Sequence, residues 1–148
     1  MQKLLLAFLL ISSPANAEPT ILTGTATKVR DGDTIKIGKI PIRLNGVFAP
    51  ELKETHGAQS KQFMRELVDG KTVRCVMTGA KTYDRFVGTC YLDGEDIGIA
   101  MIAAGMALDC PRYSGGRCVG VEVMFAGRKR IGYAQRLIWE RYRILIKH

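Results

Sequence analysis

The chain has 148 residues, a length that suits one domain and needs no metal or cofactor to build a hydrophobic core. Its 22 lysines and arginines exceed its 14 acidic residues, which gives a net charge of +8 at pH 7. That charge fits a polyanionic partner such as nucleic acid or an anionic membrane surface, but it fits a basic protein without such a partner equally well.

The first 17 residues have the pattern of a secretory signal. Lys3 precedes the apolar run Leu4 to Ile11, and Ala15-Asn16-Ala17 supplies a small-residue cleavage site. The run is too short to cross a bilayer and no other stretch can cross one, so a retained membrane anchor is the less favoured alternative. We therefore expect a soluble mature protein that begins at Glu18 and is periplasmic or secreted.

The next segment predicts three strands joined by a polar turn. Residues 21–29 are rich in threonine and favour a strand, and apolar residues alternate with polar ones over 34–37 and 40–44. Residues 31–33, Asp-Gly-Asp, predict a hairpin turn because glycine accepts a positive φ and aspartate tolerates it.

The alternation also predicts where the polar side chains of this segment point. Arg43 falls on the face opposite Ile42 and Leu44, and so away from the core layer. Asp33, Arg43 and Glu51 are therefore expected to converge at one end of a small barrel.

The remaining elements alternate between strand and helix patterns. After a loop over residues 52–57, the sequence predicts a helix over 58–68, a strand over 72–78, a turn over 79–84 and a strand over 85–92. A short helix over 97–104, an irregular loop over 107–120 and a weaker helix over 121–133 follow. Residues 134–148 form a tail in which basic residues alternate with apolar ones. This tail reads either as an amphipathic helix that docks on the domain or an anionic surface, or as a terminal helix without function, which we favour.

Taken together, the periodicity of these elements alone indicates a small α+β domain.

Four cysteines, all beyond the signal segment, predict two disulfides in an oxidising compartment. They are Cys75, Cys90, Cys110 and Cys118, and they allow three pairings. No Cys-x-x-Cys or Cys/His spacing indicates zinc.

An ordered set of motifs resembles the staphylococcal nuclease family. The set is VRDGDT, IRLNGV, APE and then YDR at Tyr83–Arg85, and the resemblance covers about residues 23–133 but not the tail. It implies a five-stranded OB-fold-like Greek-key barrel with about three helices, an α+β fold over residues 18–133. It also makes the strands of Cys75 and Cys90 hairpin partners, so we expect Cys75–Cys90 and, by remainder, Cys110–Cys118.

The same residues suit phosphodiester hydrolysis. In-line attack places negative charge on the phosphate oxygens, which Arg43 and Arg85 could bind as bidentate cations. Glu51 could serve as the base, and Asp33 could hold a hard cation. The resemblance implies the same catalytic roles for Arg43, Arg85 and Glu51. It also implies that Asp33 is a Ca²⁺ ligand and that Asp31 lies in the outer shell of the ion. It implies cleavage of DNA and RNA to 3′-phosphate products.

Two departures from the family pattern affect the metal site and its surroundings. Phe48 stands where the family has a second calcium-binding aspartate, which leaves Asp33, the Ala49 carbonyl and water as candidate ligands, with Asp31 or Glu51 as further candidates. Fewer carboxylates mean weaker calcium binding. Asp84 stands where the family has glycine.

Three functions follow in order of preference. The first is an exported, calcium-assisted nuclease, monomeric and without an obligate protein partner. The second is an OB-type module that binds nucleic acid and has lost turnover through Phe48. The third is an envelope-associated structural protein that uses the basic tail.

Overall fold

The computed structural model describes residues 18–54 and 56–117. The signal segment, the predicted helix over 121–133, the tail and Cys118 lie outside these residues, and they remain predictions. Within the described ranges, no helix is long and apolar enough to cross a membrane.

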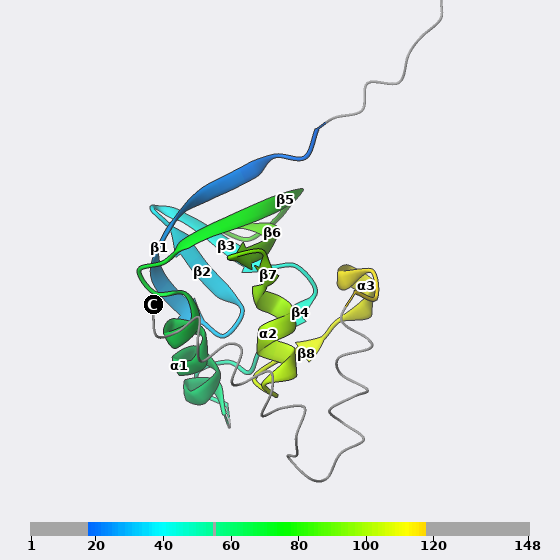
Figure 1. Ribbon diagram of the computed structural model, residues 1–148. Coiled ribbons are helices and arrows are strands. Elements are labelled where there is room, and N and C mark those ends of the chain that lie inside the picture. The colour runs from blue at the N-terminus through cyan, green and yellow to red at the C-terminus, as the bar shows by residue number, and fades with distance from the viewer. Residues whose placement is uncertain (1–17, 55, 118–148) are drawn as a thin grey trace, which may run out of the picture.

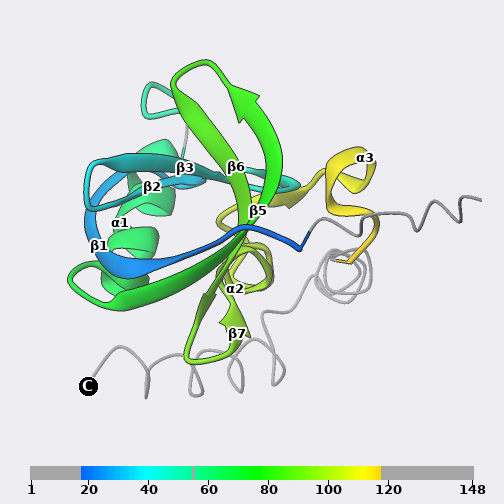
Figure 2. The ribbon, with the colours of Figure 1, turned by 90° about the horizontal axis from the view of Figure 1, so that it is seen from above.

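Five strands close into a small barrel (Figure 2). Their order is β3-β2-β1-β5-β6, and β3 also pairs with β6 in parallel, which closes the sheet. The strands are β1 (Ile21–Asp31), β2 (Thr34–Ile37), β3 (Ile40–Leu44), β5 (Thr72–Thr82) and β6 (Arg85–Leu92). With three helices, this architecture confirms the predicted OB-fold-like α+β class.

Two helices cover one end of the barrel (Figure 1). They are α1 (Gly57–Val68), between β3 and β5, and α2 (Ile97–Ala103), after β6. The alternating apolar residues of the strands meet the buried faces of both helices in one core, which includes Ile35, Ile42, Val73, Met64 and Met101. Each fully buried side chain of this kind contributes about 1.5–3 kcal/mol, so the barrel and both helices depend on one another.

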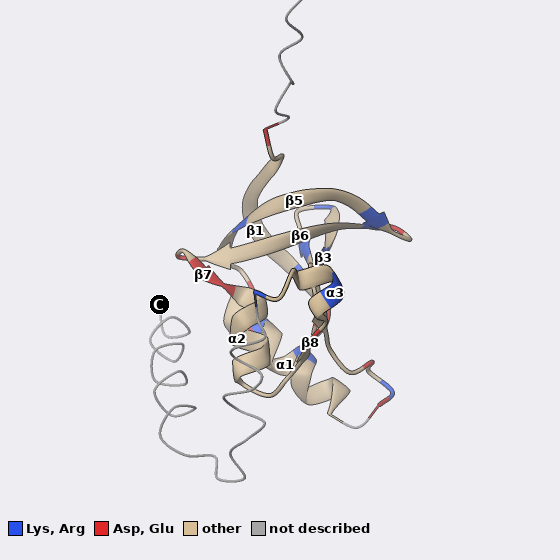
Figure 3. Cartoon of the chain, turned by 90° about the vertical axis from the view of Figure 1, so that its right-hand side faces the viewer, with Lys and Arg blue, Asp and Glu red and all other residues tan. Residues whose placement is uncertain are grey.

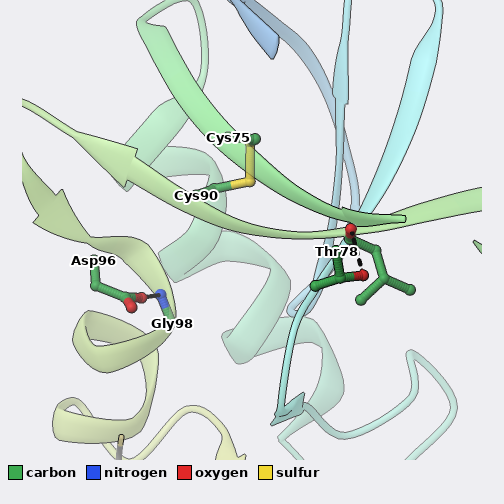
Figure 4. The surroundings of a disulfide bond; sticks show 6 residues. Cys75, Thr78, Cys90, Asp96 and Gly98 are labelled. Carbon is green, nitrogen blue, oxygen red and sulfur yellow. Dashed lines mark hydrogen bonds between the residues drawn. A yellow bond between two sulfur atoms is a disulfide. The ribbon is translucent and has the colours of Figure 1, made fainter. Parts of the chain in front are cut away.

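The predicted disulfide between Cys75 and Cys90 is present (Figure 4). The two residues lie directly opposite each other on β5 and β6, and both are buried in the core. Cys110 has no disulfide partner among the described residues, and the predicted Cys110–Cys118 bond involves a residue outside them and stays a prediction.

Two predicted irregular segments contain regular structure instead. β5 continues to Thr82, past an irregularity between Met77 and Lys81, so the predicted turn over 79–84 shrinks to Tyr83 and Asp84. Tyr83 takes the left-handed backbone conformation with φ 56, and it does so at the tip of a hairpin, where its side chain is exposed.

The predicted loop over 107–120 contains a strand, β8 (Leu108–Asp109), and a short helix, α3 (Pro111–Ser114). β8 pairs with β4 (Val47–Phe48), and a third short strand, β7 (Glu95–Asp96), pairs with the end of β6. Arg117 connects this segment to the barrel through two contacts. Its Nε lies 3.0 Å from Asp96 Oδ2, and its Nη2 donates to the Asn45 carbonyl. The segment after α2 is thereby held against the β3–β4 connection.

Candidate active site

Three barrel strands bring one aspartate and two arginines together. An Arg43 Nη1 donates to Asp33 Oδ1 at 2.9 Å, and Thr34 Oγ1 donates to the same oxygen at 2.8 Å. Arg85 Nη1 donates to Thr34 Oγ1 at 3.0 Å. Asp33 lies in the turn just before β2, and Thr34 on β2 therefore links the Asp33–Arg43 ion pair to Arg85 at the start of β6. The convergence of Asp33 and Arg43 agrees with the alternation of the sequence.

Asp33 is the most buried charged group of this site, with 4% of its surface exposed. Burial raises its pKa to about 6; the charge of Arg43 opposes this rise, while the neighbouring charge of Asp31 adds to it. The Ala49 N–H lies 3.4 Å from Asp33 Oδ2, and Asp31 Oδ1 accepts the Asp33 N–H at 3.1 Å. Asp31 thus shapes the turn and does not itself contact an arginine in the described hydrogen bonds.

Gly32 is needed here for space and not, as the sequence suggested, for a positive φ. Gly32 is absent from the glycines with a positive φ. A side chain at this position would overlap Ser60 Oγ on α1 and would come within 2.7 Å of the Ala49 Cβ. The Asp-Gly-Asp turn therefore packs closely against α1 and the 48–51 segment, and this contact fixes the position of Asp33.

Both arginines line one pocket of about 370 Å³. Three aromatic residues, Phe48, Tyr83 and Tyr113, line it as well, and so does Cys110. Arg85 Nε is buried and has no hydrogen-bond partner within the described part of the chain. An unpaired buried donor is costly, so the hydrogen bonds of the Arg85 guanidinium are incomplete as the site stands.

Glu51 does not join this group. It is exposed in the loop after Pro50, and its described hydrogen bonds are backbone ones: its N–H donates to Glu54 Oε2 at 2.7 Å, and its carbonyl accepts the Glu54 N–H at 2.8 Å. The expected convergence of the Glu51 side chain with Asp33 and Arg43 is therefore not seen. Only the backbone two residues earlier reaches the cluster, since the Ala49 N–H lies 3.4 Å from Asp33 Oδ2.

The donors near Asp33 are few for a calcium ion, which prefers six to eight oxygen ligands. Within the described residues, no three His, Cys, Asp or Glu side chains gather where they could hold a metal. Both carboxylate oxygens of Asp33 already accept hydrogen bonds, and Phe48 contributes no oxygen. The residues present fit a complete calcium site poorly, so a calcium ion here would be held weakly and the charge stabilisation would come from the arginines.

The second departure, Asp84, belongs to a surface ion pair. Asp84 Oδ2 lies 2.9 Å from Arg30 Nη1, and this hydrogen bond is the main reason that the pKa of Asp84 is lowered. Figure 3 shows basic and acidic residues together at the tip of the β5–β6 hairpin. Exposed pairs of this kind contribute little to stability, so Asp84 replaces the glycine without disturbing Arg85.

Sequence reasoning did not single out Thr34 or Tyr113. Thr34 could have been found, because it falls on the face opposite Ile35, just as Arg43 falls on the face opposite Ile42, and the two are partners in the β2–β3 register. Tyr113 could not, because it reaches the pocket from α3, which the sequence read as irregular loop.

Comparison with known proteins agrees with this fold and motif set. The staphylococcal nuclease homologue family matches residues 41–125, more than half of the chain. The chain belongs to this family.

Relatives at 30–36% identity carry different names. An "Uncharacterized endonuclease" of Haemophilus influenzae is 30% identical over 119 residues, 77% of this chain and 65% of the relative. An "Uncharacterized endonuclease" of Escherichia coli O157:H7 is 35% identical over 96 residues, 62% of this chain and 63% of the relative. The "Succinoglycan biosynthesis protein ExoI" of Rhizobium meliloti is 36% identical over 116 residues, 70% of this chain and 60% of the relative. The chain thus spans a little under two thirds of the length of these curated relatives.

Proposed function

We propose that this chain is an exported nuclease that hydrolyses the phosphodiester bonds of DNA, RNA or both. The observation that carries the proposal is the pair of arginines, Arg43 and Arg85, which line one pocket and are linked through Thr34. Two of the relatives at 30–35% identity carry the name endonuclease, which supports the same class.

The arginines bind the phosphate whose bond is broken. Arg43 is held by Asp33 through one Nη, which leaves its other N–H groups for an anion. Arg85 is held by Thr34 and brings an unpaired Nε–H. In the transition state the negative charge moves onto the phosphate oxygens, and two fixed guanidinium groups stabilise it without having to reorganise.

Glu51 takes the proton of the attacking water. A general base must lie within hydrogen-bond reach of that water, and the exposed position of Glu51 requires the 49–51 segment to adjust when substrate binds. Asp33 orients Arg43. A weakly bound calcium ion, held by Asp33 with the Ala49 carbonyl, water and Asp31 in the outer shell, would add positive charge near the phosphate.

The products, location and oligomeric state complete the proposal. We infer 3′-phosphate ends and a monomer without an obligate protein partner, both from the family resemblance. A periplasmic or secreted location is supported by the signal pattern of residues 1–17 and by the buried Cys75–Cys90 disulfide, which suits an oxidising compartment.

The test is release of acid-soluble nucleotides from DNA and from RNA, with calcium and with a chelator. We expect release by the wild type and a loss of about 100-fold or more with Arg43→Ala or Arg85→Ala. Arg74→Ala is the matched control, because Arg74 is exposed on β5 and lines neither of the two cavities described. Product ends that a polymerase extends only after phosphatase treatment would identify 3′-phosphates. Equal release by the wild type and the Arg85→Ala variant would refute the proposal.

A second candidate function is nucleic-acid binding without hydrolysis. It is favoured by Phe48 at the position of a metal carboxylate and by the thin donor set around Asp33. This candidate predicts salt-sensitive binding of oligonucleotides and no product at any calcium concentration.

A further inference from the structure

Phe48 separates two cavities on the same side of the molecule. It lines the arginine pocket, and it also lines a groove of about 520 Å³ whose other walls are Pro50, Lys53, Glu54 and Leu108. In the described part of the chain, Phe48 is the one residue common to both linings. Anything that leaves the arginine pocket toward the 48–54 loop must pass over this ring.

The ring is presented to solvent and not to the core. Phe48 is 51% exposed and Leu108 is 57% exposed, and the two face each other as cross-strand partners in the β4–β8 ladder. Cross-strand partners place their side chains on one face, so Phe48 and Leu108 form a continuous apolar surface. Eight large hydrophobic residues are exposed in the described chain, and four of them line the two cavities. These four are Phe48, Leu108, Tyr83 and Tyr113. Apolar surface concentrated in this way marks a binding surface.

The charges along the two cavities suit a strand of nucleic acid. Arg43 and Arg85 lie in the pocket, and Lys53 lies in the groove. The one carboxylate in the groove wall, that of Glu54, accepts the Glu51 N–H and so is tied to the loop backbone. A path with cations at both ends and an aromatic ring between them matches a chain in which phosphates alternate with flat bases.

We propose that the groove is a subsite for the nucleotide next to the cleaved phosphate, with its base against Phe48 and Leu108 and its phosphate toward Lys53. This inference rests on the proposed function, because the arginine pocket must hold a phosphate for the groove to receive the neighbouring nucleotide. A nucleotide and not a protein segment is the occupant, because the groove shares Phe48 with the arginine pocket and has the cation of Lys53 in its wall. At this position the chain carries a base-binding surface in place of a carboxylate.

Binding measurements in a Glu51→Gln background, which suppresses turnover, test the subsite on the full chain. The probes are thymidine 5′-monophosphate, a fluorescent tetrathymidylate, and the same oligonucleotide with one abasic position moved along the strand. Phe48→Ala should weaken tetrathymidylate binding about 10-fold and mononucleotide binding by a clearly smaller factor. Phe48→Trp should restore it, and Phe48→Leu should not. Leu52→Ala is the control, because Leu52 is also exposed on this loop but lines neither cavity.

The abasic probes give a double-mutant cycle. One abasic position should weaken wild-type binding about as much as Phe48→Ala does, and that position should cost nothing further in Phe48→Ala. Equal losses for the mononucleotide and the tetranucleotide, or strictly additive losses at every abasic position, would overturn the subsite while the arginine pocket stands. If neither probe binds the parent protein, the proposed function fails together with the subsite.

Discussion

The arginine side of the pocket and the loop side differ in how their functional groups are held. Arg43, Thr34 and Arg85 stand on paired barrel strands, and the parallel β3–β6 pairing that closes the barrel sets the two arginines side by side. Phe48 and Glu51 stand on a two-residue strand and an exposed loop. The phosphate-binding geometry therefore comes with the barrel itself. The side chains of Phe48 and Glu51 are exposed and depend on that loop, and Phe48 is one of the two positions at which the chain departs from the family pattern.

The largest expected effect comes from the arginine side. Arg85→Lys keeps the charge but loses the planar fork that contacts Thr34 and leaves Nε for an anion. If the chain hydrolyses nucleic acid, the rate should fall about 100- to 1000-fold, while Tm changes by less than about 3 °C. Nucleotide release and thermal melting measure the two quantities. Arg74→Lys, on the same barrel but at an exposed position, should leave both unchanged. Full activity in Arg85→Lys would remove Arg85 from the site.

The barrel that carries this side is held by the Cys75–Cys90 disulfide between β5 and β6. Replacing both cysteines by alanine should lower the free energy of unfolding by about 3 kcal/mol, because the bond closes a loop of 15 residues in the unfolded chain and its loss also leaves space in the core. Denaturant unfolding measures the change. Below its melting temperature the variant should still bind mononucleotide, since Arg43 and Arg85 contact neither cysteine. A variant as stable as the wild type would show that the bond adds nothing to the barrel.

Asp33 lies where the two sides meet, and its buried charge makes the site costly to fold. Burial raises its pKa to about 6 in the folded protein, from an ordinary value of 3.8. The folded state therefore holds this proton more tightly than the unfolded chain. The contribution of Asp33 to stability is favourable at pH 4, is lost as pH rises toward 6, and stays lost above that. The difference between the two pKa values corresponds to a free energy of about 3 kcal/mol.

Asp33→Asn should remove that cost. In a buffer with a chelator, the variant should be about 1–3 kcal/mol more stable than the wild type at pH 8, and the difference should shrink toward pH 4. Denaturant unfolding between pH 4 and pH 8 measures it. Asp84→Asn is the control, because Asp84 is exposed and its pKa is lowered, so that substitution should not stabilise the protein. A destabilised Asp33→Asn variant at pH 8 would mean that the Arg43 ion pair outweighs desolvation.

The two sides were also unequally predictable from sequence. The barrel strands and α1 follow from regular alternation and helical spacing, and the same alternation placed Arg43 opposite Ile42 and Leu44. The strands and α1 depend on periods that run through several consecutive residues. The disulfide pairing did not come from periodicity, because it followed from the hairpin partnership that the family resemblance implied.

The loop side has no such period. A ladder of two residues each, β4 with β8, joins segments about 60 residues apart in a way that no local pattern encodes. For the same reason the exposure of Glu51, and the arrival of Tyr113 from α3, could not be read from the sequence. Gly32 was read correctly as a turn residue but for the wrong reason, since its close neighbours, Ser60 and Ala49, come from other elements.

The smallest expected effect on stability, and the sharpest test of the loop side, is Phe48→Asp. The ring is 51% exposed, so its removal should cost less than about 1 kcal/mol. The new carboxylate adds an anionic oxygen next to Ala49, whose N–H lies 3.4 Å from Asp33, and a hard cation gains a ligand. Calcium should then bind about 10-fold more tightly, and any hydrolysis should saturate at lower calcium.

Calcium titration without nucleic acid, in which the thermal shift reports binding, measures the gain in calcium affinity. It is not affected by the loss of the aromatic surface at position 48. Phe48→Asn is the matched control, because it removes the ring without adding a charge. It should share the small loss of stability and not the gain in calcium affinity. A folded Phe48→Asp variant with unchanged calcium affinity and unchanged nucleotide release would show that Asp33 and the Ala49 carbonyl do not form the metal site proposed above. Binding without hydrolysis would then describe this chain better than a nuclease does.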